Sequence, residues 1–324
     1  MVTVLCANAG VDKTWEIANF AVGGFYQPGQ VLTVAGGKGI NVARGLAALG
    51  VAHRVTGFAG GNNGRFLTSQ LLDAGSHPDF VTIAEESRVT ANIVDRVQHT
   101  QTRVDEVGPL VTPGEVDRLT AKWRKLLETS QMAIIAGSAP RGVSRELYAE
   151  LTEIAREAKV PLILDAHDEL LARAVLARPM MIKPNLSELQ QLVRRQLSVP
   201  DGVVAVGREL VADGLRVVVV TLGARGAIGV TDAHGIWWAR PPKVAAVNLV
   251  GSGDAFLAGF VAASLERLSF GDRLKFAAAA GAANVTTVGA GQISRAKIEE
   301  LLAEVKLDRL DADQQPDTEP TDEQ

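Results

Sequence analysis

The stretch Val250-Gly251-Ser252-Gly253-Asp254-Ala255-Phe256 combines three small residues, an acid and the start of an apolar run. This pattern predicts a helix with Asp254 in its first turn, where the N–H groups of Gly251, Ser252 and Gly253 are left open. The first turn of a helix has unpaired N–H donors and about half a positive charge, so an anion can bind there. A carboxylate beside that anion can accept a proton from a hydroxyl, which is the minimum needed to move a phosphoryl group onto an alcohol. Gly-Ser-Gly-Asp is also a common loop and helix cap. The rest of the sequence therefore has to distinguish a structural cap from a phosphoryl-transfer site.

The bulk properties indicate a globular protein with one or two domains. The 324 residues are 47% apolar and 22% charged, with a net charge of −4 and no basic stripe, which argues against nucleic-acid binding. Cys6 is the one cysteine, so no disulfide can form within the chain, as expected in a reducing compartment. The N-terminus lacks a basic region before its apolar run, no apolar stretch is long enough to span a membrane, and the five histidines lack metal-ligand spacing. We expect a cytoplasmic protein without membrane or nucleic-acid partners.

Apolar strands and helices alternate along most of the chain. Such a pattern predicts an α/β fold with a mostly parallel sheet covered by helices on both faces, and ligands bind at the carboxyl ends of its strands. The expected strands are residues 2–7, 51–58, 132–136, 162–165, 180–183, 217–221 and 227–230. The expected helices are residues 40–49, 65–74, 114–129, 144–159, 186–195, 203–214, 270–288 and 294–306, together with the one that contains Asp254.

Two segments have a different pattern. Residues 90–95 and 102–107 alternate between apolar and polar positions around a polar tip, which is typical of a hairpin with one wet face. Together with two short strands near residues 15–17 and 30–34, they predict a small sheet that stands off the main body. From residue 310 the chain is acidic and polar, which is typical of a disordered tail.

Six strings in the same order resemble the ribokinase-like (PfkB) carbohydrate kinase family. Gly36-Gly37-Lys38-Gly39-Ile40-Asn41-Val42-Ala43 and residues 250–254 resemble its two signatures. The other four are similar to the 1-phosphofructokinase and tagatose-6-phosphate kinase branch: residues 8–14, 137–142, 183–188 and 221–226. The resemblance covers residues 1–305 and implies a ribokinase-like kinase domain over 1–308, a small β-sheet lid built from about 12–35 and 88–110, and a disordered tail over 309–324.

The resemblance implies an enzyme that uses ATP and Mg²⁺ with Asp254 as the base. The residues expected to bind the sugar are Asp12, Gly36, Gly37, Lys38, Asn41, Arg88, Asn92 and Ser138. An ionised Asp12 suits two sugar hydroxyls, while Lys38 at a helix start opposes the helix dipole and so calls for a functional reason. Asp165 either caps the next turn or takes part in the site.

A second group of residues at strand ends is expected to bind the nucleotide: Lys183, Asn185, Thr221, Gly223 and Gly226. Asn284 is added to this group by family likeness alone. Asn185 and Glu188 are expected to hold Mg²⁺ through water, and the same pair also reads as a helix capping box. No P-loop string is present, so the ATP site is of another type.

The sequence departs from the family pattern at the lid. Thr90 stands where sugar-phosphate kinases of the family usually have an arginine, and Phe25, Tyr26 and Gln27 occupy a hairpin that often carries cations. A dianionic phosphate needs fixed cations, and Lys38, Arg88 and Arg103 could supply them from new positions. Leu249-Val250 replaces a more usual polar residue, which puts a monovalent-cation site in doubt.

The leading hypothesis is therefore an ATP-dependent kinase of a phosphorylated ketohexose, of the fructose 1-phosphate or tagatose 6-phosphate type. The alternatives are a kinase of an unphosphorylated sugar or nucleoside, and a non-catalytic sugar-binding protein on the same fold. Apolar faces on the lid hairpins also predict a homodimer that forms through the lid.

Overall fold

The structure is a computed structural model that describes residues 1–287 and 289–311. Its main body is built on an eleven-stranded sheet in the order β15-β14-β13-β12-β11-β10-β9-β1-β4-β5, with β6 paired to β4. The pairings from β5 to β12 are parallel, and β13, β14 and β15 add an antiparallel edge. The strands are β1 (Val2–Cys6), β4 (His53–Gly60), β5 (His77–Pro78), β6 (Val81–Ile83), β9 (Met132–Ala136), β10 (Leu162–Asp165), β11 (Met181–Ile182), β12 (Val217–Thr221), β13 (Ala227–Thr231), β14 (Gly235–Arg240) and β15 (Lys306–Arg309).

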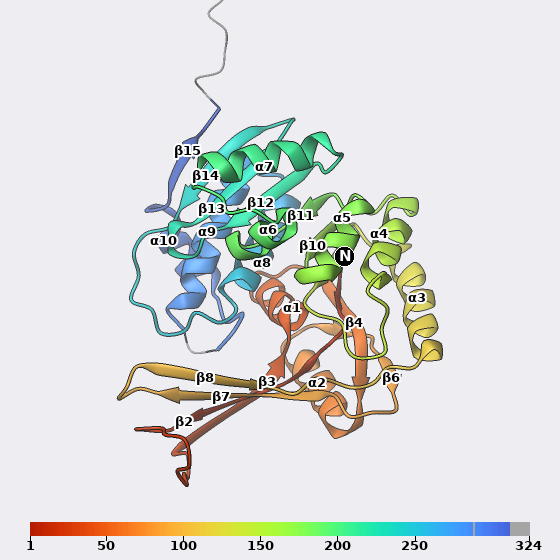
Figure 1. Cartoon of the computed structure of the whole chain (residues 1–324), viewed down its shortest axis with the longest axis vertical. Coiled ribbons are helices and arrows are strands. Elements are labelled where there is room, and N and C mark those ends of the chain that lie inside the picture. Colours follow the sequence, from red (N-terminus) through yellow and green to blue (C-terminus); the bar gives the residue numbers. More distant parts are fainter. Residues whose placement is uncertain (288, 312–324) are drawn as a thin grey trace, which may run out of the picture.

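Helices cover both faces of this sheet (Figure 1). On one face lie α3 (Pro113–Leu127), α4 (Leu147–Glu157), α5 (Asp168–Leu176), α6 (Leu186–Val193) and α7 (Asp201–Ala212). On the other face lie α1 (Lys38–Ala48), α8 (Ser252–Leu265), α9 (Phe270–Val285) and α10 (Arg295–Leu302). None of the described helices combines the length and apolarity needed to cross a membrane.

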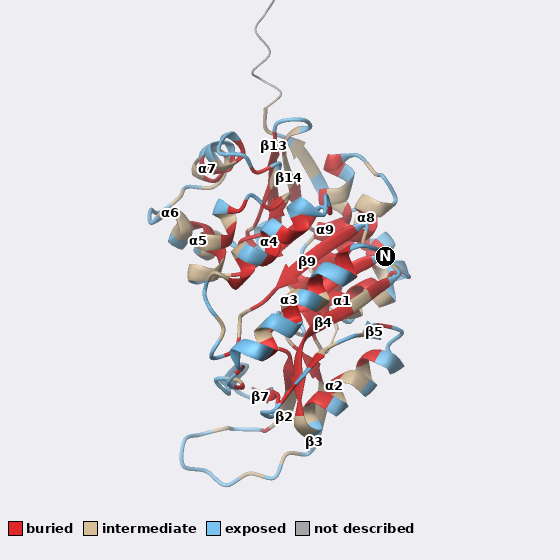
Figure 2. Ribbon diagram, turned by 90° about the vertical axis from the view of Figure 1, so that its right-hand side faces the viewer, coloured by how far each residue is buried: buried red, intermediate tan, exposed pale blue. Residues whose placement is uncertain are grey.

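The central strands are apolar at every position because both of their faces are covered. In β9, Ile135 packs into the core beneath α3 and α4, whereas Ile134 packs into the core beneath α8 and α9. Neighbouring side chains of a strand point to opposite faces, so a run such as Met132–Ala136 is buried throughout. Figure 2 shows this buried centre running through β9 and β4.

The lid is a separate four-stranded sheet in the order β3-β2-β7-β8. It contains β2 (Gly10–Glu16), β3 (Gln30–Gly36), β7 (Arg88–Asp95) and β8 (Thr100–Asp105), and it projects from the main body in Figure 1. A third core attaches it, in which Val11 and Ala35 of the lid pack with Leu67 and Leu71 of α2 (Gly61–Asp73). The predicted small sheet and its hairpin are confirmed, and the α/β class with a mostly parallel sheet is confirmed as well.

The predicted boundaries of two segments near the C-terminal end of the described chain were wrong. The segment 294–306 is not one helix, because α10 ends at Leu302 and Lys306 begins β15. β15 pairs with β14, so residues 309–311 belong to the fold, and only residues 312–324 of the predicted tail lie outside the described residues. The elements β5, β6, α5 and β14 were not predicted.

Apolar side chains remain exposed on the lid. Val31 in β3 and Val104 in β8 are 54% and 58% exposed, and the register of the sheet places them on the same face. Phe25, in the loop between β2 and β3, is also exposed. Exposed apolar side chains on the lid were the reason for expecting a homodimer that forms through the lid. The homodimer itself stays a prediction.

Candidate active site

A cavity of about 1140 Å³ lies between the lid and the carboxyl ends of the parallel strands. Five consecutive strand ends deliver side chains to it: Asn8 after β1, Ser138 after β9, Asp165 at the end of β10, Lys183 after β11 and Thr221 at the end of β12. The lid supplies the opposite wall. Parallel strands bring their carboxyl ends to one edge of the sheet, which is why residues far apart in the sequence meet here.

Most of the predicted site residues line this cavity. They are Asp12, Gly37, Lys38, Asn41, Arg88, Ser138, Lys183, Asn185, Glu188, Thr221, Gly223, Gly226, Gly251, Ser252, Gly253 and Asp254. Gly36, Asn92 and Asn284 are not among the lining residues.

Asp254 lies in the first turn of α8, as predicted, and its side chain is 6% exposed. Gly251 caps the helix with φ at 82°, and a Cβ there would lie 2.5 Å from that of Ala290, so this cap requires glycine. The N–H of Ser252 makes only a long hydrogen bond, 3.4 Å to Leu249 O, and the first-turn residues Gly251, Ser252 and Gly253 border the cavity, where the N–H groups at a helix start can bind a ligand. The carboxylate and the open amides therefore share one end of the cavity.

Asn41 holds the Asp254 carboxylate. Its Nδ2 donates a hydrogen bond to Oδ2 of Asp254 at 2.8 Å, and its Oδ1 accepts one from Arg44. The prediction gave Asn41 to the sugar, whereas the structure shows its amide engaged with two side chains of the protein.

The protonation of Asp254 is shifted by its surroundings. Burial, and then the Asp165 carboxylate, raise the pKa of Asp254 to about 6, although the hydrogen bond from Asn41 and the charges of Lys38 and Lys183 oppose this. A carboxyl with that pKa is mostly ionised at neutral pH and is still basic enough to accept a proton.

Asp165 lies between two lysines. Its side chain is 1% exposed, with Lys38 Nζ at 3.1 Å from Oδ1 and Lys183 Nζ at 3.0 Å from Oδ2. Burial would raise the pKa of Asp165, but the two ammonium groups hold it below its usual value. Burial likewise opposes the charge of Lys38, yet Asp165 and Glu188 raise its pKa above the ordinary lysine value. Lys38 therefore has carboxylate partners within the protein, and it carries a firm positive charge beside Asp254.

The predicted capping box at the start of α6 is confirmed. Asn185 Oδ1 accepts from the Glu188 N–H at 2.9 Å, and Glu188 Oε2 accepts from the Asn185 N–H at 2.8 Å. The other oxygen of Glu188 lies 3.5 Å from Lys38 Nζ. In the described part of the chain no group of three His, Cys, Asp or Glu side chains is placed to cage a metal ion.

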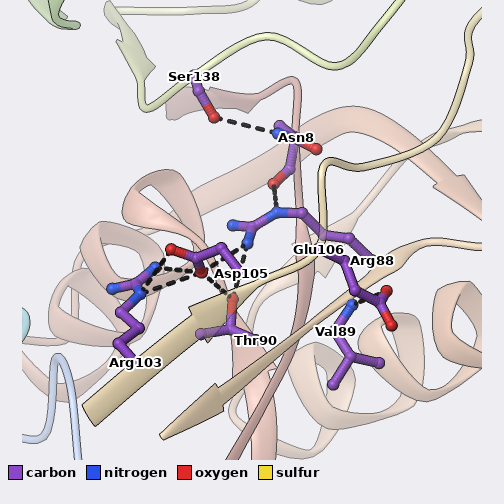
Figure 3. Close-up of polar contacts among 8 residues, drawn as sticks. All are labelled: Asn8, Arg88, Val89, Thr90, Arg103, Asp105, Glu106 and Ser138. Carbon is purple, nitrogen blue, oxygen red and sulfur yellow. Dashed lines mark hydrogen bonds and ion pairs between the residues drawn. The ribbon is translucent and has the colours of Figure 1, made fainter. Parts of the chain in front are cut away.

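The lid end of the cavity contains two arginines and one shared carboxylate (Figure 3). Arg88 is 9% exposed, and its Nε donates to the backbone oxygen of Asn8 at 3.1 Å. Its Nη1 donates to Thr90 Oγ1 at 2.7 Å and lies 3.4 Å from Asp105 Oδ1. Arg103 donates to the same carboxylate through Nε and Nη2 at about 2.9 Å.

Three acceptor oxygens near the lid are buried without a hydrogen-bond partner: Asn8 Oδ1, Asp12 Oδ1 and Asn92 Oδ1. Burial raises the pKa of Asp12, although Arg88 and Arg103 oppose the shift. Buried acceptors without donors are costly, and of these three residues Asn8 and Asp12 line the cavity, where a ligand rich in hydroxyl groups would offer donors.

Two predicted roles do not fit their positions. Gly36 does not line the cavity, and a Cβ there would lie 2.2 Å from Asp12 Cγ, so this glycine makes room for the Asp12 carboxylate. Asn284 is fully buried, with Nδ2 donating to Val250 O at 3.0 Å and Oδ1 accepting from Gly291 N–H at 2.8 Å. It ties the loops beside α8 together and does not border the cavity.

Several lining residues escaped the prediction of the site: Asn8, Asp105, Glu106 and Lys243, whereas Arg103 was named as a possible cation for a phosphate. Asn8 had a detectable signal, because it follows a buried strand as Ser138 does. Asp105 had none, since an acid in an exposed strand usually faces solvent.

The comparisons with known proteins agree with this geometry. The family model described as pfkB family carbohydrate kinase matches residues 18–297. The chain belongs to this family.

The similar solved structures include two phosphofructokinases. Phosphofructokinase-2 from Escherichia coli, solved in complex with substrates and products, is 28% identical, with coverage of 94% of this chain and 98% of that chain and a TM-score of 0.88. A possible 1-phosphofructokinase from Thermotoga maritima is 27% identical, covers 95% and 99%, and also has a TM-score of 0.88. Ribokinase from Arabidopsis thaliana, at 22% identity, 93% and 98% coverage and a TM-score of 0.74, shares the fold. The chain is thus a carbohydrate kinase with phosphofructokinase-like neighbours.

The buried ion pair gives a first prediction. Replacing Lys183 by methionine leaves Asp165 buried with one lysine, so we expect the free energy of unfolding to fall by roughly 3 kcal/mol. Adding Asp165→Asn to this variant removes the stranded charge, so the double variant loses less stability than the sum of the two single variants. Urea unfolding of the three variants checks this, and strictly additive losses would contradict it.

Proposed function

We propose that this chain transfers the γ-phosphoryl group of ATP to a hydroxyl of a phosphorylated ketohexose, of the fructose 1-phosphate or tagatose 6-phosphate type. The single observation that carries the proposal is the position of Asp254, a buried carboxylate at the cavity beside the open first-turn amides of α8. The names of the solved neighbours support the choice of acceptor, since one of them is the Escherichia coli phosphofructokinase-2 in complex with fructose-6-phosphate.

In this proposal Asp254 is the general base. Its carboxylate, oriented by Asn41, takes the proton of the acceptor hydroxyl as that oxygen bonds to the γ-phosphorus and the bond from this phosphorus to the oxygen of ADP breaks, so that ADP leaves. The N–H groups of Gly251, Ser252 and Gly253 hold the charge of the transferred group, and preorganised donors of this kind contribute about 3 kcal/mol each. Lys38 and Lys183 add positive charge at the same end of the cavity.

The nucleotide is assigned to the wall formed by the ends of β11 and β12. Thr221, Gly223 and Gly226 line it, with Lys183 and Asn185 next to them. Mg²⁺ accompanies the ATP as part of that substrate and neutralises its phosphates. Glu188 and Asn185 already use oxygens in the capping box, so they fit an ion that keeps its own waters.

The sugar is assigned to the lid end of the cavity. Asn8 and Asp12 line this cavity, each has a buried oxygen without a hydrogen-bond partner, and ketose hydroxyl groups are donors of the kind that these oxygens lack. Ser138 lies beside Asn8, whose Nδ2 donates to its hydroxyl at 3.1 Å. Arg88 and Arg103 are the guanidinium groups available for a phosphate on the sugar.

A second candidate is the kinase of an unphosphorylated sugar. The observation in its favour is that Arg88 and Arg103 already share the carboxylate of Asp105, and that Thr90 stands at the usual arginine position. A non-catalytic sugar-binding protein is disfavoured, because the chain retains both the Asp254 carboxylate and the glycines at the start of α8 that phosphoryl transfer would use.

The experiment that tests the function is ADP release over a panel of acceptors. The panel contains fructose 1-phosphate, fructose 6-phosphate and tagatose 6-phosphate, with fructose, tagatose, ribose and adenosine as unphosphorylated counterparts. We expect turnover with a ketohexose phosphate. Turnover with only the unphosphorylated compounds would replace the proposal by the second candidate, and sugar binding without ADP release would support a binding protein.

The variant Asp254→Asn tests the base. It keeps the size and the hydrogen bond of the side chain but cannot accept a proton, so we expect kcat to fall by about 10²- to 10⁴-fold with an unchanged melting temperature. The matched control is Asp201→Asn, an exposed acid in the first turn of α7, which should leave turnover unaltered. Near-normal turnover by Asp254→Asn would disprove this role.

The pH dependence tests the same carboxylate independently. Protonated Asp254 cannot act as a base, so kcat/KM should fall about tenfold per pH unit below the pKa of about 6 and level off above it. In Asn41→Ala the hydrogen bond that favours the charged form is lost, so this acidic limb should move to higher pH. A limb at the same pH in both proteins would rule out Asp254 as the titrating group.

A further inference from the structure

We propose that Asp105 is a specificity-determining residue, which weakens the binding of phosphorylated sugars by holding both arginines of the lid that face the cavity. This inference rests on the sugar-kinase function proposed above and names the residue that sets the choice of acceptor. Asp105 is the last residue of β8, where it lies opposite Thr90 of β7.

The contacts of Asp105 form a closed set (Figure 3). Its carboxylate accepts three hydrogen bonds from Nε and Nη2 of Arg103 and one from Thr90 Oγ1 at 2.7 Å, and it lies 3.4 Å from Arg88 Nη1. Thr90 in turn accepts from Arg88 at 2.7 Å. Asp105 therefore occupies the Nε and Nη2 donors of Arg103, a pair that could otherwise bind a phosphate, because a carboxylate and a phosphate bind the same guanidinium fork.

The side chains of this set differ in how firmly the surrounding protein holds them in place. Arg88 is 9% exposed and tied to the backbone of Asn8, so its position is determined by the fold. Arg103 and Asp105 are each 46% exposed and sit on one strand two residues apart. Asp105 can thus yield its partners to a ligand, but each time it does so an ion pair is lost.

The charges around this end of the cavity oppose a dianion. The ionisable lid side chains that line it are Asp12, Arg88, Arg103, Asp105 and Glu106, which is two positive groups against three negative ones. Glu106 is not free to leave, because its Oε2 accepts from the N–H of Val89 at 2.7 Å. Removing the charge of Asp105 would leave the arginines balanced by the other acids and open to a phosphate, whereas an uncharged sugar would feel little difference.

The direct test is Asp105→Asn in the full-length chain. Asparagine keeps the size and can still accept from Thr90. We expect the KM for fructose 1-phosphate and fructose 6-phosphate to fall about five- to tenfold, with kcat within about twofold and the KM for fructose unchanged. The control is Glu16→Gln, the same change of charge on the same lid, where Glu16 pairs with Arg96 at 2.7 Å; its constants should match the wild type.

The double variant Asp105→Asn/Arg103→Met identifies the cause. Its KM for the sugar phosphates should return towards the wild-type value, because only Arg88 would then remain to bind the phosphate. An unchanged KM for both sugar phosphates in Asp105→Asn would overturn the proposal. A rise in the KM for fructose would overturn it as well, because Asp105 would then be an acceptor for a sugar hydroxyl.

Binding of inorganic phosphate separates this inference from the proposed function. Isothermal titration with phosphate requires no turnover, and Asp105→Asn should bind it about five- to tenfold more tightly than the wild type and Glu16→Gln do. If no sugar in the panel is phosphorylated, the proposed function fails and this titration still decides the role of Asp105. Equal phosphate affinity in all three proteins would refute that role.

Discussion

The hydrogen bond between Asn41 and Asp254 is the contact on which the site depends. It joins two residues 213 positions apart, each in the first part of a helix that begins at the cavity. The two helices can approach closely because small residues face each other, since a Cβ at Gly45 would lie only 2.7 Å from that of Ala258. The base is thus held by the packing of α1 against α8 and not by its own loop.

At each end of the cavity a carboxylate lies between two cationic side chains, but the two carboxylates differ in how deeply they are buried. At the phosphoryl-transfer end Asp165 lies between two lysines and is 1% exposed, so its ion pairs form a permanent part of the fold. At the lid end Asp105 lies between two arginines and is 46% exposed. A buried carboxylate keeps its partners because stranding a charge costs several kcal/mol, while a half-exposed one can exchange them with a ligand. The first arrangement positions charge for chemistry, and the second leaves its arginines available to the acceptor.

Much of the fold was predictable because its signals are local. Runs such as residues 132–136 and 217–221 are apolar throughout, which is typical of strands covered on both faces. The edge elements were not predictable in this way. β15 follows α10 after a short turn, residues 303–305, and its partner β14 contains two tryptophans and an arginine, so neither has the pattern of a buried strand. Their strand conformation comes from pairing with each other and with β13.

The sequence by itself determined the helix start that holds Asp254, the capping box of Asn185 and Glu188, and the alternation that makes a parallel sheet. These depend on neighbours within one turn or one strand, where residue type controls conformation. Only the tertiary structure decided that Asn41 serves Asp254, that Asn284 ties loops together, and that Asp105 meets both Arg88 and Arg103. Each of those pairings joins separate elements, and the distance between two elements is set by packing, which no local pattern encodes.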